Sequence, residues 1–135
     1  MLAGARLAMV TRRREIVVDG AFDDTANWTE GTNWTVANGV AACAGNGAAN
    51  GCTQVATTIA GARYRVEFDI VTVTAAGAGM SAVVAGVNGA IYTAVGHQVD
   101  FITATAGGAQ NIGIVARGDG MFAGTIDNLS IERVS

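Results

Sequence analysis

Residues 63–70 read RYRVEFDI, and this short alternation indicates the fold. Its four even positions are large and apolar, from Tyr64 to Ile70, and its four odd positions are charged, from Arg63 to Asp69. Successive side chains of a β-strand point to opposite faces of a sheet, so this pattern predicts a strand with one buried and one exposed face.

The rest of the chain repeats this alternation less cleanly, between glycine-rich turns. Turn signals such as Asn88-Gly89 and Gly107-Gly108 recur about every ten residues, and no long window has the period of a helix. Further strands are predicted at residues 15–18, 34–42, 53–59, 80–87, 90–94, 98–105, 111–116 and 124–133. We therefore expect an all-β fold, an antiparallel β-sandwich or jelly roll.

The length and hydropathy of the chain indicate one domain and no membrane span. A chain of 135 residues can bury a core of its own. Half of the residues are hydrophobic, but Gly, Thr, Asn and Asp interrupt every run well short of the roughly 18 apolar residues of a span. The apolar residues 1–10 precede three arginines instead of following them, which is the wrong order for a secretory signal.

Charge divides the chain into a basic arm, residues 1–15, and an acidic body, residues 16–135. The arm has a net charge of +3, from Arg6, Arg12, Arg13 and Arg14 against Glu15, and the body has −6, from four arginines and ten acids. Such an arm binds phosphates or an acidic protein surface, and otherwise frays as a solvated terminus. With no aromatic residue among the arginines, we expect a protein partner and not nucleic acid.

The sequence lacks the usual means of protecting sheet edges. It contains no Pro and no Lys, two residues that block edge-to-edge pairing of sandwiches. We expect the edges to be covered by the arm of the same chain or by neighbouring molecules.

Two cysteines, Cys43 and Cys52, flank a loop of eight residues. If the strands around this loop form a hairpin, the two sulfurs come close enough for a disulfide. Two small buried thiols are the equal alternative, because the domain is large enough to fold without a bridge.

Catalytic patterns are lacking in the sequence. The single histidine, His97, has no acid or Ser beside it in the sequence that suggests a proton relay, so we interpret it as a lone surface residue. Nucleotide-binding loops and nucleophile elbows are also missing. The sequence therefore predicts a protein that is not an enzyme.

Two short segments carry a resemblance to a known family. Residues 17–24 read VVDGAFDD and are followed by Trp28 and Trp34, and residues 124–131 read GTIDNLSI. Together they resemble the opening and closing segments of carbohydrate-binding-module-like β-sandwich domains, which also occur in bacteriophage structural proteins. Asp19 departs from the family pattern, which has Asn at that position. The resemblance covers residues 16–135 and implies that the two segments lie side by side.

The resemblance also implies a structural Ca²⁺ site, because many such sandwiches hold this ion where the two segments meet. The residues at the matching positions are Asp23 and Asp127, with Asp19 as a third. Carboxylate oxygens suit this hard cation. The alternative is that Asp127 caps a strand end through backbone N–H groups.

Sugar binding would need exposed aromatic side chains. The candidates are Trp28, Trp34, Tyr92 and Phe122, although a chain with eight aromatic residues needs most of them for its core.

From the resemblance and the basic arm we predict a non-enzymatic virion structural protein. It would be a capsid decoration or cement protein, or a tail-associated sandwich, that docks on capsid or tail subunits through its arm. Assembly in the host cytoplasm and a homo-oligomer or many copies per particle would follow. The alternative is a glycan-binding module that aids adhesion to a host surface.

Overall fold

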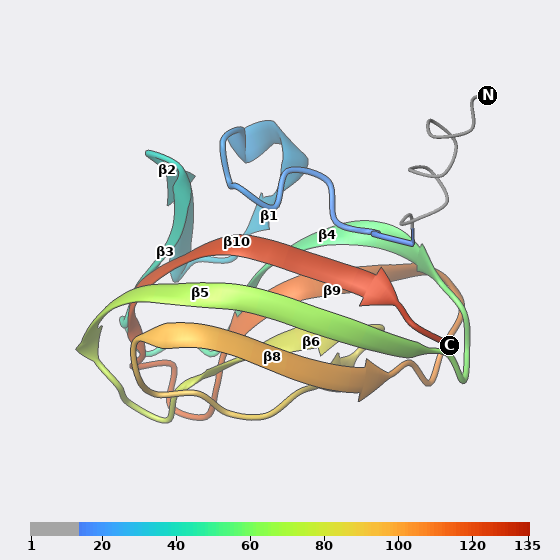
Figure 1. The fold of residues 1–135 in the computed structure, drawn as a ribbon. Coiled ribbons are helices and arrows are strands. Elements are labelled where there is room, and N and C mark those ends of the chain that lie inside the picture. Colours follow the sequence, from blue (N-terminus) through green and yellow to red (C-terminus); the bar gives the residue numbers. More distant parts are fainter. Residues whose placement is uncertain (1–13) are drawn as a thin grey trace.

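The computed structural model describes residues 14–135 and confirms the predicted all-β class. Two antiparallel sheets of five strands pack face to face as a sandwich (Figure 1). Among the described residues there is no helix long and apolar enough to cross a membrane. Arg6, Arg12 and Arg13 of the predicted arm lie outside these residues.

The two sheets are named here after their central strands. The β10 sheet has the order β2 (Trp34–Ala37), β3 (Val40–Ala44), β10 (Ala123–Arg133), β5 (Arg63–Ala75) and β8 (Gly96–Thr103). The β9 sheet has the order β1 (Thr29–Glu30), β4 (Gly51–Thr58), β9 (Gly108–Ala116), β6 (Met80–Val84) and β7 (Val87–Asn88). A 3-10 turn, η1 (Thr25–Asn27), precedes β1.

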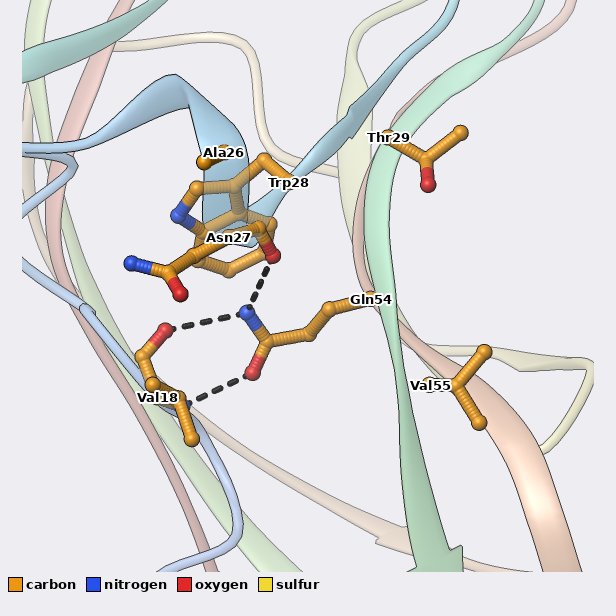
Figure 2. Close-up of a pocket in the computed structure, with 7 residues that line it drawn as sticks. All are labelled: Val18, Ala26, Asn27, Trp28, Thr29, Gln54 and Val55. Atoms are coloured by element: carbon orange, nitrogen blue, oxygen red, sulfur yellow. Dashed lines mark hydrogen bonds between the residues drawn. The ribbon is translucent and has the colours of Figure 1, made fainter.

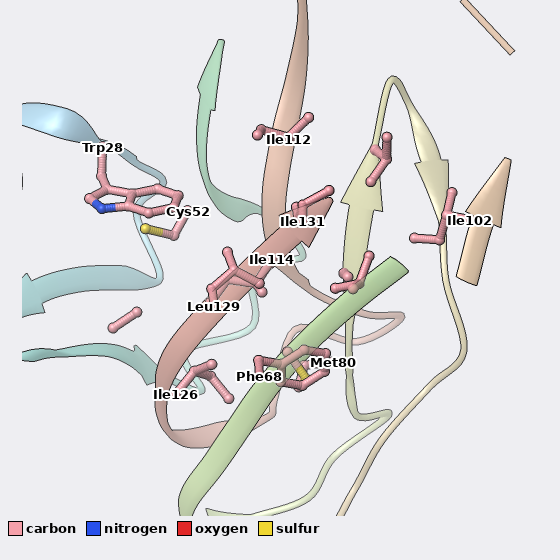
Figure 3. Packing of buried hydrophobic residues seen from close by; sticks show 14 of the residues in the cluster. Trp28, Cys52, Phe68, Met80, Ile102, Ile112, Ile114, Ile126, Leu129 and Ile131 are labelled. Atoms are coloured by element: carbon pink, nitrogen blue, oxygen red, sulfur yellow. The ribbon is translucent and has the colours of Figure 1, made fainter. Parts of the chain in front are cut away.

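The alternation at residues 63–70 forms the first part of β5, as predicted. Tyr64, Val66, Phe68 and Ile70 are all buried in the core. The core fills the space between the sheets with aliphatic and aromatic side chains (Figure 3). Each fully buried side chain of this size stabilises the fold by about 1.5–3 kcal/mol.

The opening and closing segments lie side by side, as the resemblance implies. The backbone N–H of Leu129 on β10 donates to the carbonyl of Gly20 at 2.9 Å, and that of Ile16 donates to Ile131 at the same distance. A Cβ atom on Gly20 would lie 2.0 Å from the carbonyl oxygen of Leu129, so only glycine fits at this contact.

Two predicted strands are hairpins in the structure. Residues 34–42 divide into β2 and β3 at Asn38 and Gly39, whose φ angles are 55° and 76°. Residues 80–87 divide likewise at Ala85 and Gly86, with φ angles of 52° and 81°. Two consecutive residues with positive φ make the tight turn that suits the twist of antiparallel strands.

Two other predicted strands, residues 15–18 and 90–94, are not strands. Each contributes one isolated bridge, from Glu15 to Glu132 and from Tyr92 to Met80. Neighbouring backbone N–H groups donate to side chains instead, that of Val18 to Gln54 and that of Ala90 to Asp100, so neither segment continues a ladder. The other predicted strands agree with the structure within a few residues.

The two cysteines lie on opposite sheets and are free thiols. Cys43 is on β3, which pairs with β2 and β10, whereas Cys52 is on β4, which pairs with β1 and β9. Their strands do not form a hairpin, which was the condition for a disulfide, and this structure has the alternative of two buried thiols. Burial raises the pKa of Cys43, and burial together with the charge of Glu30 raises that of Cys52 to about 12.

Candidate functional site

Three of the four aromatic residues predicted for sugar binding belong to the core. Trp28, Trp34 and Phe122 are 6%, 3% and 0% exposed, so none of them offers a ring face to a ligand. Tyr92 is half-buried, with its ring edge-on to Phe68 at 5.5 Å. For Trp28, Trp34 and Phe122 the predicted sugar-binding role is therefore corrected, because their rings pack the core of the sandwich, and for Tyr92 it stays a prediction.

The indoles of both tryptophans hold loops in place. Trp28 donates through Nε1 to the carbonyl of Asp19 at 3.2 Å, and Trp34 donates to that of Asn50 at 2.8 Å. Each ring is thus an anchor between a loop and the core.

A hollow of about 330 Å³ lies beside Trp28, between the opening segment and β4 (Figure 2). The side chain of Gln54 crosses it, donating through Nε2 to the carbonyls of Val18 and Asn27 at 2.9 and 3.1 Å. Its Oε1 accepts from the N–H of Val18 at 2.7 Å. The polar atoms of the Gln54 amide are all used to join these segments. The exposed side chains at the rim, Val18 and Val55, are apolar. We assign this hollow a structural role.

A more polar surface lies on the outer side of the β10 sheet, over β5, β8 and β10. The register between β5 and β8 places Arg65 opposite Phe101, Glu67 opposite Val99 and Asp69 opposite His97. We call this surface the β5–β8 face; its members are Arg63, Arg65, Glu67, Asp69, His97, Val99, Phe101 and Asn128.

Four hydrogen bonds link five side chains across the β5–β8 face. Arg65 Nη1 donates to Glu67 Oε1 at 2.6 Å, and Glu67 Oε2 lies 3.0 Å from His97 Nε2. His97 Nδ1 lies 2.6 Å from Asp69 Oδ1, and Asn128 Nδ2 donates to Asp69 Oδ2 at 2.8 Å. Each member holds its neighbour in one position, so the polar groups of the face are ordered before any ligand arrives.

A bulge in β10 places Asn128 on this face. The pairing of β10 with β5 shifts between Asp127 and Ser130, and Asn128 has a φ angle of 55°. Bulges redirect side chains next to binding sites, and Asn tolerates the left-handed conformation better than most residues.

Phe101 adds an exposed aromatic ring to the β5–β8 face. It is 45% exposed, and the guanidinium carbon of Arg63 lies 4.3 Å from the ring centroid. Val99, beside it on β8, is 42% exposed. The face thus combines apolar surface with fixed hydrogen-bonding groups, which is the composition of ligand sites.

The hydrogen bonds shift two pKa values on the face. Bonds from Asn128 and His97 lower the pKa of Asp69. Bonds to Asp69 and Glu67 raise the pKa of His97. Both groups are solvent-exposed, so their charges remain partly screened.

Sequence reasoning missed this site. His97 was interpreted as a lone histidine because its partners on β5, Glu67 and Asp69, lie 30 and 28 residues away in the chain. The charged positions of residues 63–69 and the alternation at 97–103 were the available signals. Only the register between the two strands brings them together.

Two of the three carboxylates predicted to bind calcium, those of Asp19 and Asp127, accept hydrogen bonds from backbone N–H groups. Asp19 accepts from the N–H groups of Asp23 and Asp24 at 2.9 and 3.0 Å, and Asp127 accepts from that of Asn128 at 2.7 Å. Among residues 14–135 there is no group of three or more acidic, His or Cys side chains placed to hold a metal ion. The three residues do not form a carboxylate cluster, and calcium binding stays a prediction.

Comparison with known proteins shows a likeness in fold. The sequence matches no protein-family description, and no curated protein matches it significantly. Among solved structures, the mannan-binding module from Man5C in its bound conformation superposes with a TM-score of 0.55, covering 84% of this chain and 97% of that one. At 15% identity, this likeness establishes a carbohydrate-binding-module-like β-sandwich as the fold.

The likeness does not bear on the predicted virion role. Arg14 is the one arginine of the arm among the described residues, and its carbonyl accepts from the N–H of Arg133 at 3.1 Å. Docking on capsid or tail subunits through the arm therefore stays a prediction.

Proposed function

We propose that this domain is a non-catalytic carbohydrate-binding module that binds a polysaccharide through its β5–β8 face. The observation that carries the proposal is the exposed ring of Phe101 beside a continuous chain of ordered hydrogen-bonding side chains. The fold likeness to a mannan-binding module supports it.

The chemistry of the face suits a sugar. A pyranose presents C–H groups on its faces and hydroxyl groups around its rim. Phe101 and Val99 offer apolar contact for the C–H groups. The carboxylates of Glu67 and Asp69 and the amide of Asn128 offer acceptors and a donor for hydroxyl groups, and hydrogen bonds to charged groups are the stronger ones.

The charge of the domain favours a neutral polysaccharide over an acidic one. Residues 14–135 contain five arginines and eleven acidic residues, a net charge of −6. At long range the net charge of the whole domain repels an anionic chain, whereas it does not repel a neutral one.

Affinity electrophoresis against a panel of neutral and acidic polysaccharides, mannan included, tests the proposal. We expect retardation by at least one neutral polysaccharide, and a loss of about tenfold in affinity for Phe101→Ala. The matched control is Val55→Ala, which removes an exposed apolar side chain from the other sheet and should leave binding unchanged. A protein that binds nothing in the panel, or a Phe101→Ala variant that binds like the wild type, would contradict the proposal.

A further inference from the structure

His97 contacts two carboxylates at once. Its Nδ1 lies 2.6 Å from Asp69 Oδ1 and its Nε2 lies 3.0 Å from Glu67 Oε2. Ionised carboxylates only accept hydrogen bonds, so both ring nitrogens must donate. A neutral imidazole has one N–H group and the imidazolium has two. The arrangement therefore belongs to protonated His97.

The charged groups around His97 favour this protonated form. β5 presents Glu67 and Asp69 to the ring, with Arg65 bound to the far oxygen of Glu67. β10 contributes Asp127, in register with Asp69, and the neutral Asn128.

The acidic residue on β8, Asp100, forms hydrogen bonds with backbone groups and not with His97. Asp100 accepts from the N–H groups of Ala90 and Phe101, both at 2.8 Å. The ring of His97 therefore contacts two negative carboxylates, and the one positive group nearby, Arg65, is already paired with Glu67.

We infer that His97 is a positioning residue of the β5–β8 face, and that its protonation makes Glu67 a weaker acceptor for the hydroxyl groups of a polysaccharide. The inference rests on the proposed function, because it concerns the same face. In the protonated state both oxygens of Glu67 have partners, Arg65 on Oε1 and His97 on Oε2.

Loss of the proton to solvent opens this arrangement. The remaining N–H stays with Asp69, whose contact is shorter, 2.6 Å against 3.0 Å. The lone pair of Nε2 then faces the lone pairs of Glu67 Oε2, and two acceptors repel each other. Glu67 keeps its bond to Arg65 and gains a free oxygen that accepts a hydrogen bond from a sugar hydroxyl.

Affinity for a neutral polysaccharide therefore rises with pH. The carboxylate partners of His97 raise its pKa above the ordinary value of 6.5. We therefore expect the increase in affinity to occur at a pH above 6.5. We expect the affinity to increase about tenfold, because one additional hydrogen bond to a charged acceptor contributes about this much to binding.

Two measurements on the whole chain test the inference. The first is an NMR titration of the ligand-free protein, in which the single histidine gives an unambiguous signal. We expect a midpoint above 6.5 that falls in Glu67→Gln. The second is the affinity for the neutral polysaccharide that binds best, measured between about pH 5.5 and 9, on either side of the histidine transition.

The variants separate the role of His97 from a general effect of pH. Glutamine at position 97 keeps a polar side chain that does not titrate, so His97→Gln should bind at the high-pH affinity of the wild type throughout. Thr103→Ala, an exposed change on the same strand, should keep the wild-type profile.

The outcomes distinguish this inference from the proposed function. A midpoint at or below 6.5, or binding that stays flat or falls as pH rises, overturns the role of His97 and leaves polysaccharide binding standing. Absence of binding at every pH, with a raised midpoint, overturns the proposed function and with it this inference.

Discussion

Asn33 is the residue that joins three loops at one end of the sandwich. It is 1% exposed, and its Nδ2 donates to the carbonyls of Ala48 and Gly120, both at 3.0 Å. Its Oδ1 accepts from the N–H of Asn46 at 3.0 Å. One buried amide therefore satisfies backbone groups that are distant in the sequence.

We predict that Asn33→Ala destabilises the domain by about 3 kcal/mol, because three hydrogen bonds are lost and the N–H of Asn46 is left without its acceptor. Urea unfolding monitored by tryptophan fluorescence measures the change. Asn46→Ala is the matched control, since the side chain of Asn46 makes one exposed local bond, to Ala48 N at 3.3 Å. Equal losses in the two variants would show that Asn33 does not have this role.

Asp19 gives the stability of the domain a dependence on pH. Burial raises the pKa of its carboxyl, but hydrogen bonds from the N–H groups of Asp23 and Asp24 outweigh this effect and leave it lowered from 3.8. The unfolded chain therefore takes up the proton first as pH falls. The stabilisation is present above pH 3.8 and is lost as pH falls through the lower folded pKa.

Asp19→Asn tests this dependence while keeping a residue that tolerates the left-handed backbone, where φ is 66°. Asn has one acceptor oxygen in place of two, so we expect a loss of about 1 kcal/mol at neutral pH. The difference in the free energy of unfolding between this variant and the wild type should shrink below pH 3.8. Urea unfolding at both pH values measures it, with Asp23→Asn as the control. A difference that does not change with pH would count against the lowered pKa.

At the scale of the element, the sequence predicted strands well and pairings poorly. The alternation at residues 63–70 was sufficient for β5, because burial of one face leaves a local pattern. The hairpin at Asn38-Gly39 was missed although this dipeptide is a strong turn signal. The pairing of β5 with β8, which forms the candidate site, depends on register between distant segments and leaves no local pattern.

The edge strands have features other than Pro and Lys that oppose edge pairing. Three edges are short: β1, β2 and β7 have 2, 4 and 2 residues. The fourth, β8, has 8 residues, but the carboxylate of Asp100 accepts from the N–H of Phe101. The hydroxyl of Tyr92 lies 3.4 Å from the carbonyl of Val99. These side chains occupy backbone groups that another strand would use.

We predict that the double variant Tyr92→Phe, Asp100→Ala self-associates. It leaves the N–H of Phe101 and the carbonyl of Val99 without their side-chain partners, on a strand that also exposes apolar side chains. Sedimentation velocity over a concentration series measures the change. Thr103→Ala on the same strand should sediment like the wild type. If the double variant also does so, Asp100 and Tyr92 do not protect the edge.

At the scale of the whole molecule, the core lies between two sheets that are joined by side-chain packing and connecting loops. Cys43 and Cys52 enter it from opposite sheets, at 4% and 0% exposure. Their thiols are therefore reporters on the separation of the sheets. A reagent reaches them when the sandwich opens and not through a local loop movement.

We predict that neither thiol reacts with a thiol-specific reagent in the folded protein, and that both react once the chain is unfolded in guanidinium. Burial protects them twice, by excluding the reagent and by raising both pKa values, that of Cys52 to about 12, so that the reactive thiolate is scarce. Under native conditions the labelling rate should follow global unfolding, and its logarithm should increase in Asn33→Ala in proportion to the lost free energy of unfolding. Mass spectrometry counts the labels. Fast labelling of the native protein would show that the sheets separate locally, and an unfolded chain that takes up no label without a reductant would reveal a disulfide.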